Sequence, residues 1–197
     1  DAYYTIATLL GLGFVVFLLL NYNAKIYSLL ALVLVGVYPY TKRFFDYPQF
    51  ILGITFNFGV FVGWAEIAGN INFATFLLYF ACVAWTIGYD TIYAFQDVAD
   101  DRKIGVKSTA ILFGRFDLII ISLLQGLFIL LLALIGYLQH FGLIWAITLG
   151  VCGGLFIWQY RHCHDRQAQH CTESFLHNHK VGMVIFLGLA LSLVFKI

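Results

Sequence analysis

Residues 89–108 of the chain read YDTIYAFQDVADDRKIGVKS, and they hold four of its ten acidic side chains and three of its eleven basic ones. If residues 90–101 form one helix, Asp90, Asp97 and Asp101 fall within about 40° of one another around its axis. Three carboxylates on one face repel each other and destabilise a helix, but they offer the hard oxygen ligands that Mg²⁺ prefers. The stretch therefore predicts a magnesium site built from these three residues.

The alternative is that this acidic run is a solvated loop, which is the usual reading of charges between apolar segments. Two neighbouring features favour the metal site. Gly105 is expected to end the helix, and Lys107 and Ser108 follow it. A lysine beside metal-binding carboxylates suits a substrate that bears phosphate.

The composition places this stretch in a membrane protein. Of the 197 residues, 62% are hydrophobic and only 11% charged, and the mean hydropathy is +0.90, whereas a soluble domain carries about 25% charge. Most of the apolar segments approach the ~20 residues that cross a bilayer, and they lack the alternation of barrel strands. The sequence predicts an all-α, polytopic membrane helix bundle with seven transmembrane helices and a single domain over residues 1–197. The segments are Tyr3–Leu20, Ala24–Tyr38, Phe50–Ala68, Ile71–Tyr89, Leu118–Leu138, Phe141–Tyr160 and Val181–Phe195.

The distribution of Lys and Arg predicts the orientation. Cations gather in alternate connections, after the second, fourth and sixth segments, and the positive-inside rule assigns these connections to the cytoplasm. The acidic stretch lies in one of them, so the site is expected to face the cytoplasm. The net charge of +1 gives no indication of nucleic-acid binding. The cations concerned are Lys42, Arg43, Arg102, Lys103, Lys107, Arg115, Arg161, Arg166 and Lys180.

The cysteines and histidines predict neither disulfides nor a metal centre. Cys82 and Cys152 lie in apolar segments, and Cys163 and Cys171 fall in a connection assigned to the reducing cytoplasm. Residues 161–179 also contain five histidines. The ligand spacing matches no standard zinc finger, so a polar interfacial loop is favoured over a zinc site.

A second polar cluster is YPYTKR at residues 38–43, where Pro39 is expected to end a helix. Lys42 and Arg43 are either interfacial anchors or, because they share a membrane face with the aspartates, ligands for a diphosphate. Within the apolar segments, Asn57 either bonds a neighbouring helix or binds substrate. Glu66 is either functional or solvated at the far interface.

These residues together resemble a known family. Residues 89–108 with TAILFG at 109–114 closely resemble the second aspartate-rich motif of the UbiA superfamily of intramembrane prenyltransferases, and the similarity is greatest to its 4-hydroxybenzoate polyprenyltransferase branch. Residues 38–43 resemble a loop of that family. Further similar positions are Pro48-Gln49, Leu52-Gly53, Phe56, Val181-Gly182 and Phe186-Leu187-Gly188.

The resemblance implies a nine-helix fold with a central cavity in which two aspartate-rich motifs bind Mg²⁺ and a prenyl diphosphate. The first motif of the family, Asn-Asp-x-x-Asp, is absent, and no Asn-Asp dipeptide occurs in this sequence. Seven segments in place of nine and the missing motif indicate that the chain is N-terminally truncated and that half of the metal site lies outside it.

The implied reaction is transfer of a polyprenyl group to the ring of 4-hydroxybenzoate in ubiquinone biosynthesis, in a bacterial inner membrane. The expected metal ligands are Asp90, Asp97 and Asp101. The cations Lys42, Arg43 and Lys107 are expected to neutralise the leaving diphosphate, and the sequence leaves open whether Arg43 instead binds the carboxylate of the acceptor. Further substrate-binding candidates are Tyr38, Tyr93 and Asn57, and the aromatic residues Phe56, Phe58, Tyr89 and Tyr93 are candidates to stabilise an allylic cation.

Two other functions remain open on the sequence. A UbiA-type enzyme could use another acceptor, such as haem, a naphthoate or a glycerol lipid. A cation or proton transporter could use the aspartates for ions, but a transporter would place carboxylates near the bilayer midplane. Here they adjoin four cations at the end of a segment, which favours phosphate chemistry. No feature of the sequence indicates the prenyl chain length or the oligomeric state.

Overall fold

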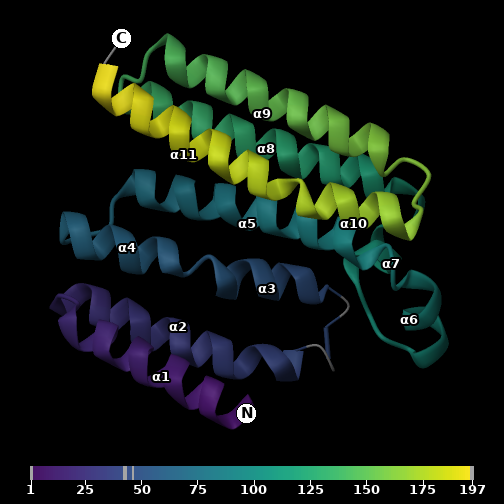
Figure 1. The fold of residues 1–197 in the computed structure, drawn as a ribbon, viewed down its shortest axis with the longest axis horizontal. Coiled ribbons are helices and arrows are strands. Elements are labelled where there is room, and N and C mark those ends of the chain that lie inside the picture. The colour runs from purple at the N-terminus through teal and green to yellow at the C-terminus, as the bar shows by residue number, and fades with distance from the viewer. Residues whose placement is uncertain (1, 42–43, 46, 196–197) are drawn as a thin grey trace.

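In the computed structural model the chain folds as layers of helices whose long members run roughly along one direction (Figure 1). The structure describes residues 2–41, 44–45 and 47–195, and these form helices and no strand. The elements are α1 (Ala2–Leu19), α2 (Tyr22–Thr41), α3 (Pro48–Phe56), α4 (Gly59–Ala68), α5 (Phe73–Ala94), α6 (Val98–Ile104), α7 (Thr109–Phe113), the 3₁₀ turn η1 (Gly114–Phe116), α8 (Asp117–Leu138), α9 (Leu143–His162), α10 (Ala168–Leu176) and α11 (Asn178–Phe195).

The helices confirm the predicted all-α, multi-pass membrane bundle. Within the described ranges, six helical stretches are long and apolar enough to cross a membrane, and Tyr3–Leu19 is a shorter apolar helix. All seven predicted segments therefore lie on helices, although the third is divided between α3 and α4. Large apolar side chains of α1 and α2 are mostly exposed, as expected for helices that face lipid.

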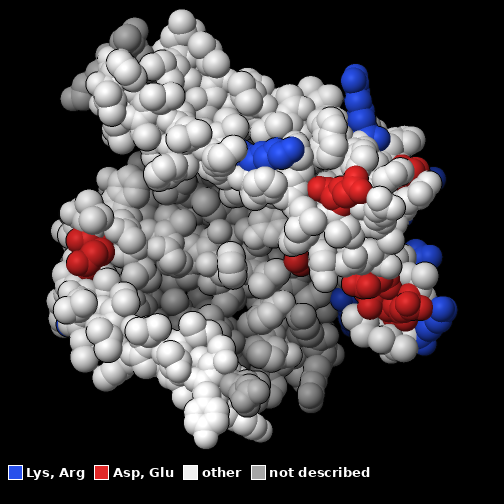
Figure 2. Space-filling view, viewed as in Figure 1, with Lys and Arg blue, Asp and Glu red and all other residues white. Residues whose placement is uncertain are grey.

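The basic connections after α5 and α9 lie at one end of the bundle, where α6 and α10 are found, and α2 ends and α3 begins at the same end (Figure 1). Figure 2 shows most of the charged side chains on the visible face gathered at that end. The prediction that these connections share one side of the membrane is consistent with this arrangement. The expectation that Pro39 ends a helix is wrong, because α2 continues two residues further to Thr41. A proline this close to a helix terminus removes only one backbone donor.

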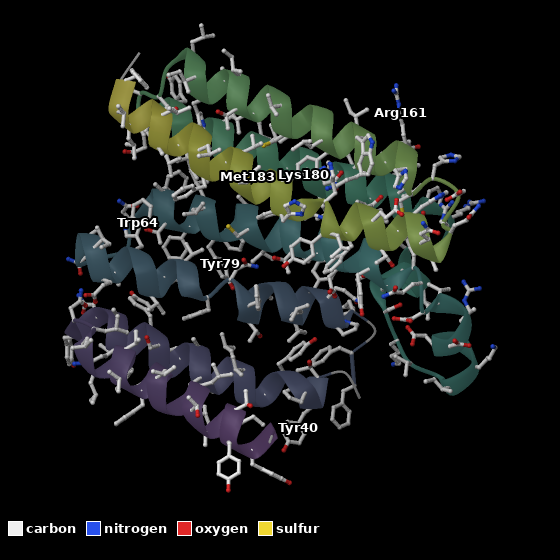
Figure 3. All side chains as sticks on the ribbon, viewed as in Figure 1. Tyr40, Trp64, Tyr79, Arg161, Lys180 and Met183 are labelled. Carbon is white, nitrogen blue, oxygen red and sulfur yellow. A yellow bond between two sulfur atoms is a disulfide. The ribbon has the colours of Figure 1, made fainter. Side chains whose placement is uncertain are left out.

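Helix α5 forms the centre of the bundle, with contacts to α3 and α4 on one side and to α8 and α10 on the other. The Tyr79 hydroxyl donates a hydrogen bond to the Ile54 carbonyl at 2.9 Å and so joins α5 to α3 (Figure 3). Phe61 packs against Tyr79 with ring centroids 4.6 Å apart. The position of α5 is thus fixed from both sides, which matters because its last turn carries Asp90.

At the opposite end of the bundle, the turn between α1 and α2 is bonded to the end of α4. The Asn21 backbone N–H donates to Glu66 Oε2 at 2.7 Å, and the Asn21 side chain donates to the Ala65 carbonyl at 2.8 Å. Asn23 donates to the Gly69 carbonyl at 2.6 Å. The sequence left open whether Glu66 has a function or is solvated. In the structure it accepts a hydrogen bond that holds two helical layers together.

Close helix packing at Gly188 leads to a stability prediction. A Cβ atom built at Gly188 of α11 would overlap the Thr148 side chain of α9, whereas one at Gly126 of α8 would meet no atom within 4 Å. Thr148 is β-branched and cannot move aside easily. Gly188→Ala should therefore destabilise the bundle by about 1–3 kcal/mol, seen as a lower midpoint of thermal unfolding in detergent. Gly126→Ala, the matched control, should be neutral or stabilising, and equal losses in both variants would contradict this packing.

Candidate active site

A cavity of about 260 Å³ lies at the basic end of the bundle, between the ends of α2 and α5, the start of α3, and the segment 97–108. Six of the residues singled out in the sequence line it together. They are Tyr38, Asp90, Tyr93, Asp97, Asp101 and Lys107, and the remaining lining residues include Gln49 and Ser108. The structure thus brings three carboxylates and a lysine to one small cavity, which we call the acidic pocket.

The acidic pocket is not built by one continuous helix, so that part of the prediction is wrong. Helix α5 ends at Ala94, and a turn over residues 95–97 precedes α6. The Asp97 N–H donates to the Ala94 carbonyl at 3.2 Å, and the Asp101 N–H donates to the Asp97 carbonyl at 2.8 Å as α6 begins. Gly105, at φ 72°, ends α6 as expected. The turn bends the chain around the cavity, so the three aspartates reach it from two helices and the turn.

Asp100, the fourth acidic residue of the stretch, does not line the pocket. Its carboxylate accepts a hydrogen bond from Lys103 Nζ at 2.8 Å, and both side chains are largely exposed. The structure therefore separates two adjacent aspartates, with Asp101 facing the cavity and Asp100 paired at the surface.

A chain of buried hydrogen bonds fixes the wall of the acidic pocket. Gln49 Oε1 of α3 accepts a hydrogen bond from the Thr109 N–H at 2.9 Å. The Thr109 hydroxyl lies 2.6 Å from the Thr91 hydroxyl, which donates to the Ile87 carbonyl of α5. These groups are buried, so each lost partner would leave an unsatisfied polar atom. The sequence marked Gln49 only as part of Pro48-Gln49, a position similar to the family, and gave no indication of this structural role.

Two of the cations that were predicted to bind the diphosphate, Lys42 and Arg43, lie outside the described residues. The helix that precedes them, α2, supplies Tyr38 to the acidic pocket. Their assignment as diphosphate ligands stays a prediction.

Asn57 lies in a second cavity, of about 420 Å³, beside the acidic pocket. It occupies the break between α3 and α4, where its amide nitrogen donates to the Gly53 carbonyl at 2.9 Å and to the Thr86 hydroxyl at 2.8 Å. Figure 2 shows a hollow between α11 and the α3–α4 layer, and Figure 3 places Lys180 on α11 at its edge. The lining residues are Phe56, Asn57, Trp85, Thr86, Tyr89, Phe175, Leu176, Asn178 and His179. We call it the aromatic cavity.

Aromatic rings connect the two cavities. The Phe175 ring of α10 lies 4.9 Å from the ring of Tyr93, in the acidic pocket, and 5.9 Å from that of Tyr89, in the aromatic cavity. Trp85 is fixed by donation from its Nε1 to Asn178 Oδ1 at 2.9 Å. Of the aromatic candidates from the sequence, Phe58 instead packs against Phe61. Trp85 and Phe175 were missed, since aromatic residues are frequent throughout the chain.

The segment with cysteines and histidines differs from the expected loop. Residues Ala168–Leu176 form α10, and Cys163 and Cys171 are joined by a disulfide, so the prediction of no disulfide is wrong. The turn between α9 and α10 brings their Cα atoms to 4.9 Å, within the range that a disulfide needs. Two histidines pair with carboxylates, His162 with Glu173 at 2.7 Å and His170 with Asp165 at 2.9 Å.

The donor set of the acidic pocket suits a hard divalent cation, because it combines carboxylates with polar side chains around one cavity. Among the residues that the structure describes, no three His, Cys, Asp or Glu side chains are close enough to hold a metal by themselves. The aspartates therefore surround the cavity without forming a closed cage. Such an open set fits an ion that also takes oxygens from a phosphate substrate, as Mg²⁺ does.

Comparison with known sequences gives consistent matches. The model of the UbiA prenyltransferase family matches residues 1–189. A 4-hydroxybenzoate octaprenyltransferase of Sodalis glossinidius is 43% identical over 94% of this chain, and one of Nitrosospira multiformis is 44% identical over 92% of it. The chain spans 64% and 63% of the lengths of these two relatives.

Comparison with solved structures supports the fold. The apo structure of a UbiA homologue from Aeropyrum pernix covers 98% of this chain with a TM-score of 0.81 at 23% identity, and the chain covers 72% of that structure. A digeranylgeranylglyceryl phosphate synthase structure matches with a TM-score of 0.70, also at 23% identity, over 98% of this chain and 69% of its own. From the match of the family model over nearly the whole sequence, together with this helix arrangement, the chain belongs to the UbiA prenyltransferase family.

Proposed function

We propose that this chain carries much of the site of an enzyme that transfers a polyprenyl group from prenyl diphosphate to the ring of 4-hydroxybenzoate, in ubiquinone biosynthesis. The observation that carries the proposal is the acidic pocket directly beside the aromatic cavity. One site can bind a charged diphosphate, and the other an apolar chain and an aromatic ring. The names of the relatives at 43% and 44% identity support this choice of substrates.

The acidic pocket is the proposed diphosphate site. Asp90, Asp97 and Asp101 would hold Mg²⁺, which when bound supplies positive charge that stabilises the departing diphosphate. Lys107 contributes a further cation in the same pocket, and Lys42 and Arg43 are proposed to act with it. Tyr38 and Tyr93 line the walls and orient the headgroup.

The aromatic cavity is the proposed place of the reacting carbons. When the C–O bond to the diphosphate breaks, the prenyl C1 becomes an allylic cation, and the π faces of Tyr93, Phe175 and Tyr89 offer electrostatic stabilisation next to the acidic pocket. The ring carbon ortho to the phenol hydroxyl then bonds to C1, and the proton on that carbon leaves. Asn57, anchored to Thr86, is proposed to contact the acceptor.

We also propose the arrangement of the domain and its membrane. The chain forms one membrane-embedded domain that acts with a further aspartate-rich segment outside this sequence. The basic end with the acidic pocket faces the cytoplasm of a bacterial inner membrane, in line with its Lys and Arg content. The Cys163–Cys171 disulfide at the same end is exceptional for a reducing compartment, and the Lys and Arg distribution is the feature on which this assignment rests.

Product analysis tests the proposal. Membranes that contain the complete reading frame should convert 4-hydroxybenzoate and octaprenyl diphosphate into prenylated product when Mg²⁺ or Mn²⁺ is present. A strong chelator of divalent cations should abolish turnover, because the diphosphate charge is then unscreened. A zinc-selective chelator should have no effect. Product from a dihydroxynaphthoate or a glycerol lipid, but not from 4-hydroxybenzoate, would refute the acceptor assignment.

The control for the metal assignment is the cysteine pair. Replacing Cys163 and Cys171 together by Ser should leave the rate nearly unchanged, since neither residue lines the acidic pocket or the aromatic cavity. Stoichiometric zinc that is lost in this double variant would show that metal chemistry resides in the segment 161–179 instead.

A further inference from the structure

A third cavity, of about 580 Å³, lies on the other side of α6 from the acidic pocket. Asp97, just before α6, and Asp101 of α6 line the acidic pocket, whereas Val98, Ala99 and Arg102 of α6 line this one. Its remaining residues come from the turn after α5, from α7 and η1, from the start of α8, and from the turn after α9. They are Phe95, Ala110, Gly114, Arg115, Asp117 and Arg166. We call it the arginine cavity.

The arginine cavity has an excess of positive charge. Asp117 is 4% exposed, and its two carboxylate oxygens accept hydrogen bonds from Arg166 Nε at 2.9 Å and from an Arg166 terminal nitrogen at 2.5 Å. This bidentate pair leaves the formal charges of Arg102 and Arg115 uncompensated. Neither of them forms an ion pair with any other residue in the described part of the chain. The cavity therefore presents about two net positive charges around one concave space.

The geometry of Arg166 indicates that its side chain forms a fixed part of the cavity wall. Its backbone has φ 56°. Within the described ranges it is one of two non-glycine residues with a positive φ, a conformation that persists only where its surroundings enforce it. The hydrogen bond to Asp117 raises the pKa of Arg166, and the nearby Tyr160 raises it less. Arg115 is placed above the Phe116 ring, 4.7 Å from its centroid.

The position of the arginine cavity in the fold suggests which kind of anion it binds. It lies where α5 and α9 end and α8 begins, and these helices are candidate membrane spans. Side chains at such helix ends lie at the level of lipid headgroups. Single cations at this level are often anchors that contact the headgroup region without selectivity. Guanidinium groups that converge on one concave space differ from such anchors, because they can bind a phosphate through paired hydrogen bonds.

A mostly apolar groove runs away from this end, between α8 and α9. It has a volume of about 370 Å³, and two glycines in its lining, Gly126 and Gly153, leave it open. Its polar end contains Ser122, five residues after Asp117 in α8, and Tyr160, six residues before Arg166. The other lining residues are Gln125, Ile129, Phe156 and Ile157. The groove lies between two membrane spans, and one end of it is close along the chain to residues of the arginine cavity. A lipid with its acyl chain in the groove would therefore have its headgroup at the level of the cavity.

We propose that the arginine cavity binds the phosphate of an anionic phospholipid and that the groove between α8 and α9 holds one of its acyl chains. Arg102 and Arg115 contact the phosphate, while Asp117 keeps Arg166 in the cavity wall. This site is separate from the acidic pocket, and its occupant is a lipid that is bound and not consumed. Because α6 buries none of its own residues, a lipid held by Arg102 would also fix the position of the helix that carries Asp101.

Lipid titration of the purified chain in detergent tests the headgroup contact. The probes are fluorescent phosphatidylglycerol and fluorescent phosphatidylcholine of the same chain length. The unmodified chain should prefer the anionic lipid by about tenfold or more, given the attraction of two cations near a membrane surface. The Arg102→Gln, Arg115→Gln double variant should lose this preference. Lys103→Gln is the matched control, because it removes a cation from the same helix outside the cavity, and it should bind within about twofold of the unmodified chain.

Two further arms identify the ligand. Gly126→Leu should weaken binding of long-chain phosphatidylglycerol but not of its dihexanoyl form, since a Cβ at Gly126 meets no atom within 4 Å and the added side chain enters the groove. Inorganic phosphate at millimolar concentration should not displace the lipid. Displacement by phosphate would assign the cavity to a free anion and overturn the lipid proposal. If Lys103→Gln lost the preference for the anionic lipid to the same extent, general surface charge would explain the binding, and the lipid proposal would be overturned as well.

Discussion

Asp101→Asn is expected to reduce prenyl transfer at least a hundredfold, and Asp97→Asn to have an effect of similar size. Both residues line the acidic pocket, and the amide keeps the shape of each side chain while it removes the negative charge that we propose holds a divalent cation. Loss of one charged ligand weakens an interaction that supplies several kcal/mol in the transition state, and each ~1.4 kcal/mol corresponds to a factor of ten in rate. The rate is measured in membranes with the complete reading frame, at matched protein levels and across a Mg²⁺ titration.

The chain provides a closely matched control for this prediction. Asp100 is adjacent to Asp101, but it pairs with Lys103 at the surface and does not line the pocket. An exposed pair of this kind contributes little to stability, so Asp100→Asn should stay within about twofold of the unmodified rate. If Asp100→Asn were as damaging as Asp101→Asn, overall charge at this end of the bundle would explain the effect, and the assignment of individual metal ligands would be wrong.

The sequence predicted the helical class and the members of the acidic pocket better than it predicted how the pocket is built. Hydrophobic length alone located the membrane helices, because spanning a bilayer requires about 20 apolar residues. The turn at residues 95–97 was missed, since it contains neither Gly nor Pro and nothing in the local pattern marks a helix end. The three aspartates nevertheless line one cavity, because the turn carries Asp97 and Asp101 around the cavity that Asp90 also faces.

Contacts between distant segments account for most of what the sequence did not reveal. Gln49 and Thr109 are 60 residues apart in the chain, and no local pattern predicts which buried amide will meet which backbone N–H. The disulfide shows the same limitation, because it depends on the turn that brings α9 and α10 together and not on the spacing of Cys163 and Cys171 alone. Asn57 was singled out correctly as a polar residue within an apolar segment, but only the structure showed that its amide bonds to Thr86.

Residues 1–197 expressed alone should insert and fold but give no prenylated product. The acidic pocket contains one aspartate-rich motif, and no Asn-Asp-x-x-Asp pattern occurs in this sequence. One set of carboxylates supplies only part of the metal binding that a diphosphate, with up to three negative charges, requires. The relatives that the chain resembles are longer, since it spans 64% of the Sodalis glossinidius enzyme.

The aromatic cavity gives a second, independent reason for this expected loss. Phe56 in its lining is 70% exposed, and Figure 2 shows the hollow between α11 and the α3–α4 layer open on one face. An allylic cation formed there lacks the wall that the proposed further segment would supply. Water that enters from the basic end would hydrolyse the cation before the acceptor ring attacks, because an active site must exclude water from such an intermediate. The assay supplies 4-hydroxybenzoate, octaprenyl diphosphate and Mg²⁺ to membranes that contain residues 1–197, with the complete reading frame as the positive control. A cooperative thermal transition of the purified chain in detergent would show that an inactive sample is folded. Prenylated product above the level of membranes without the chain would mean that one aspartate-rich motif is sufficient and that the open face does not admit water to the reacting carbon.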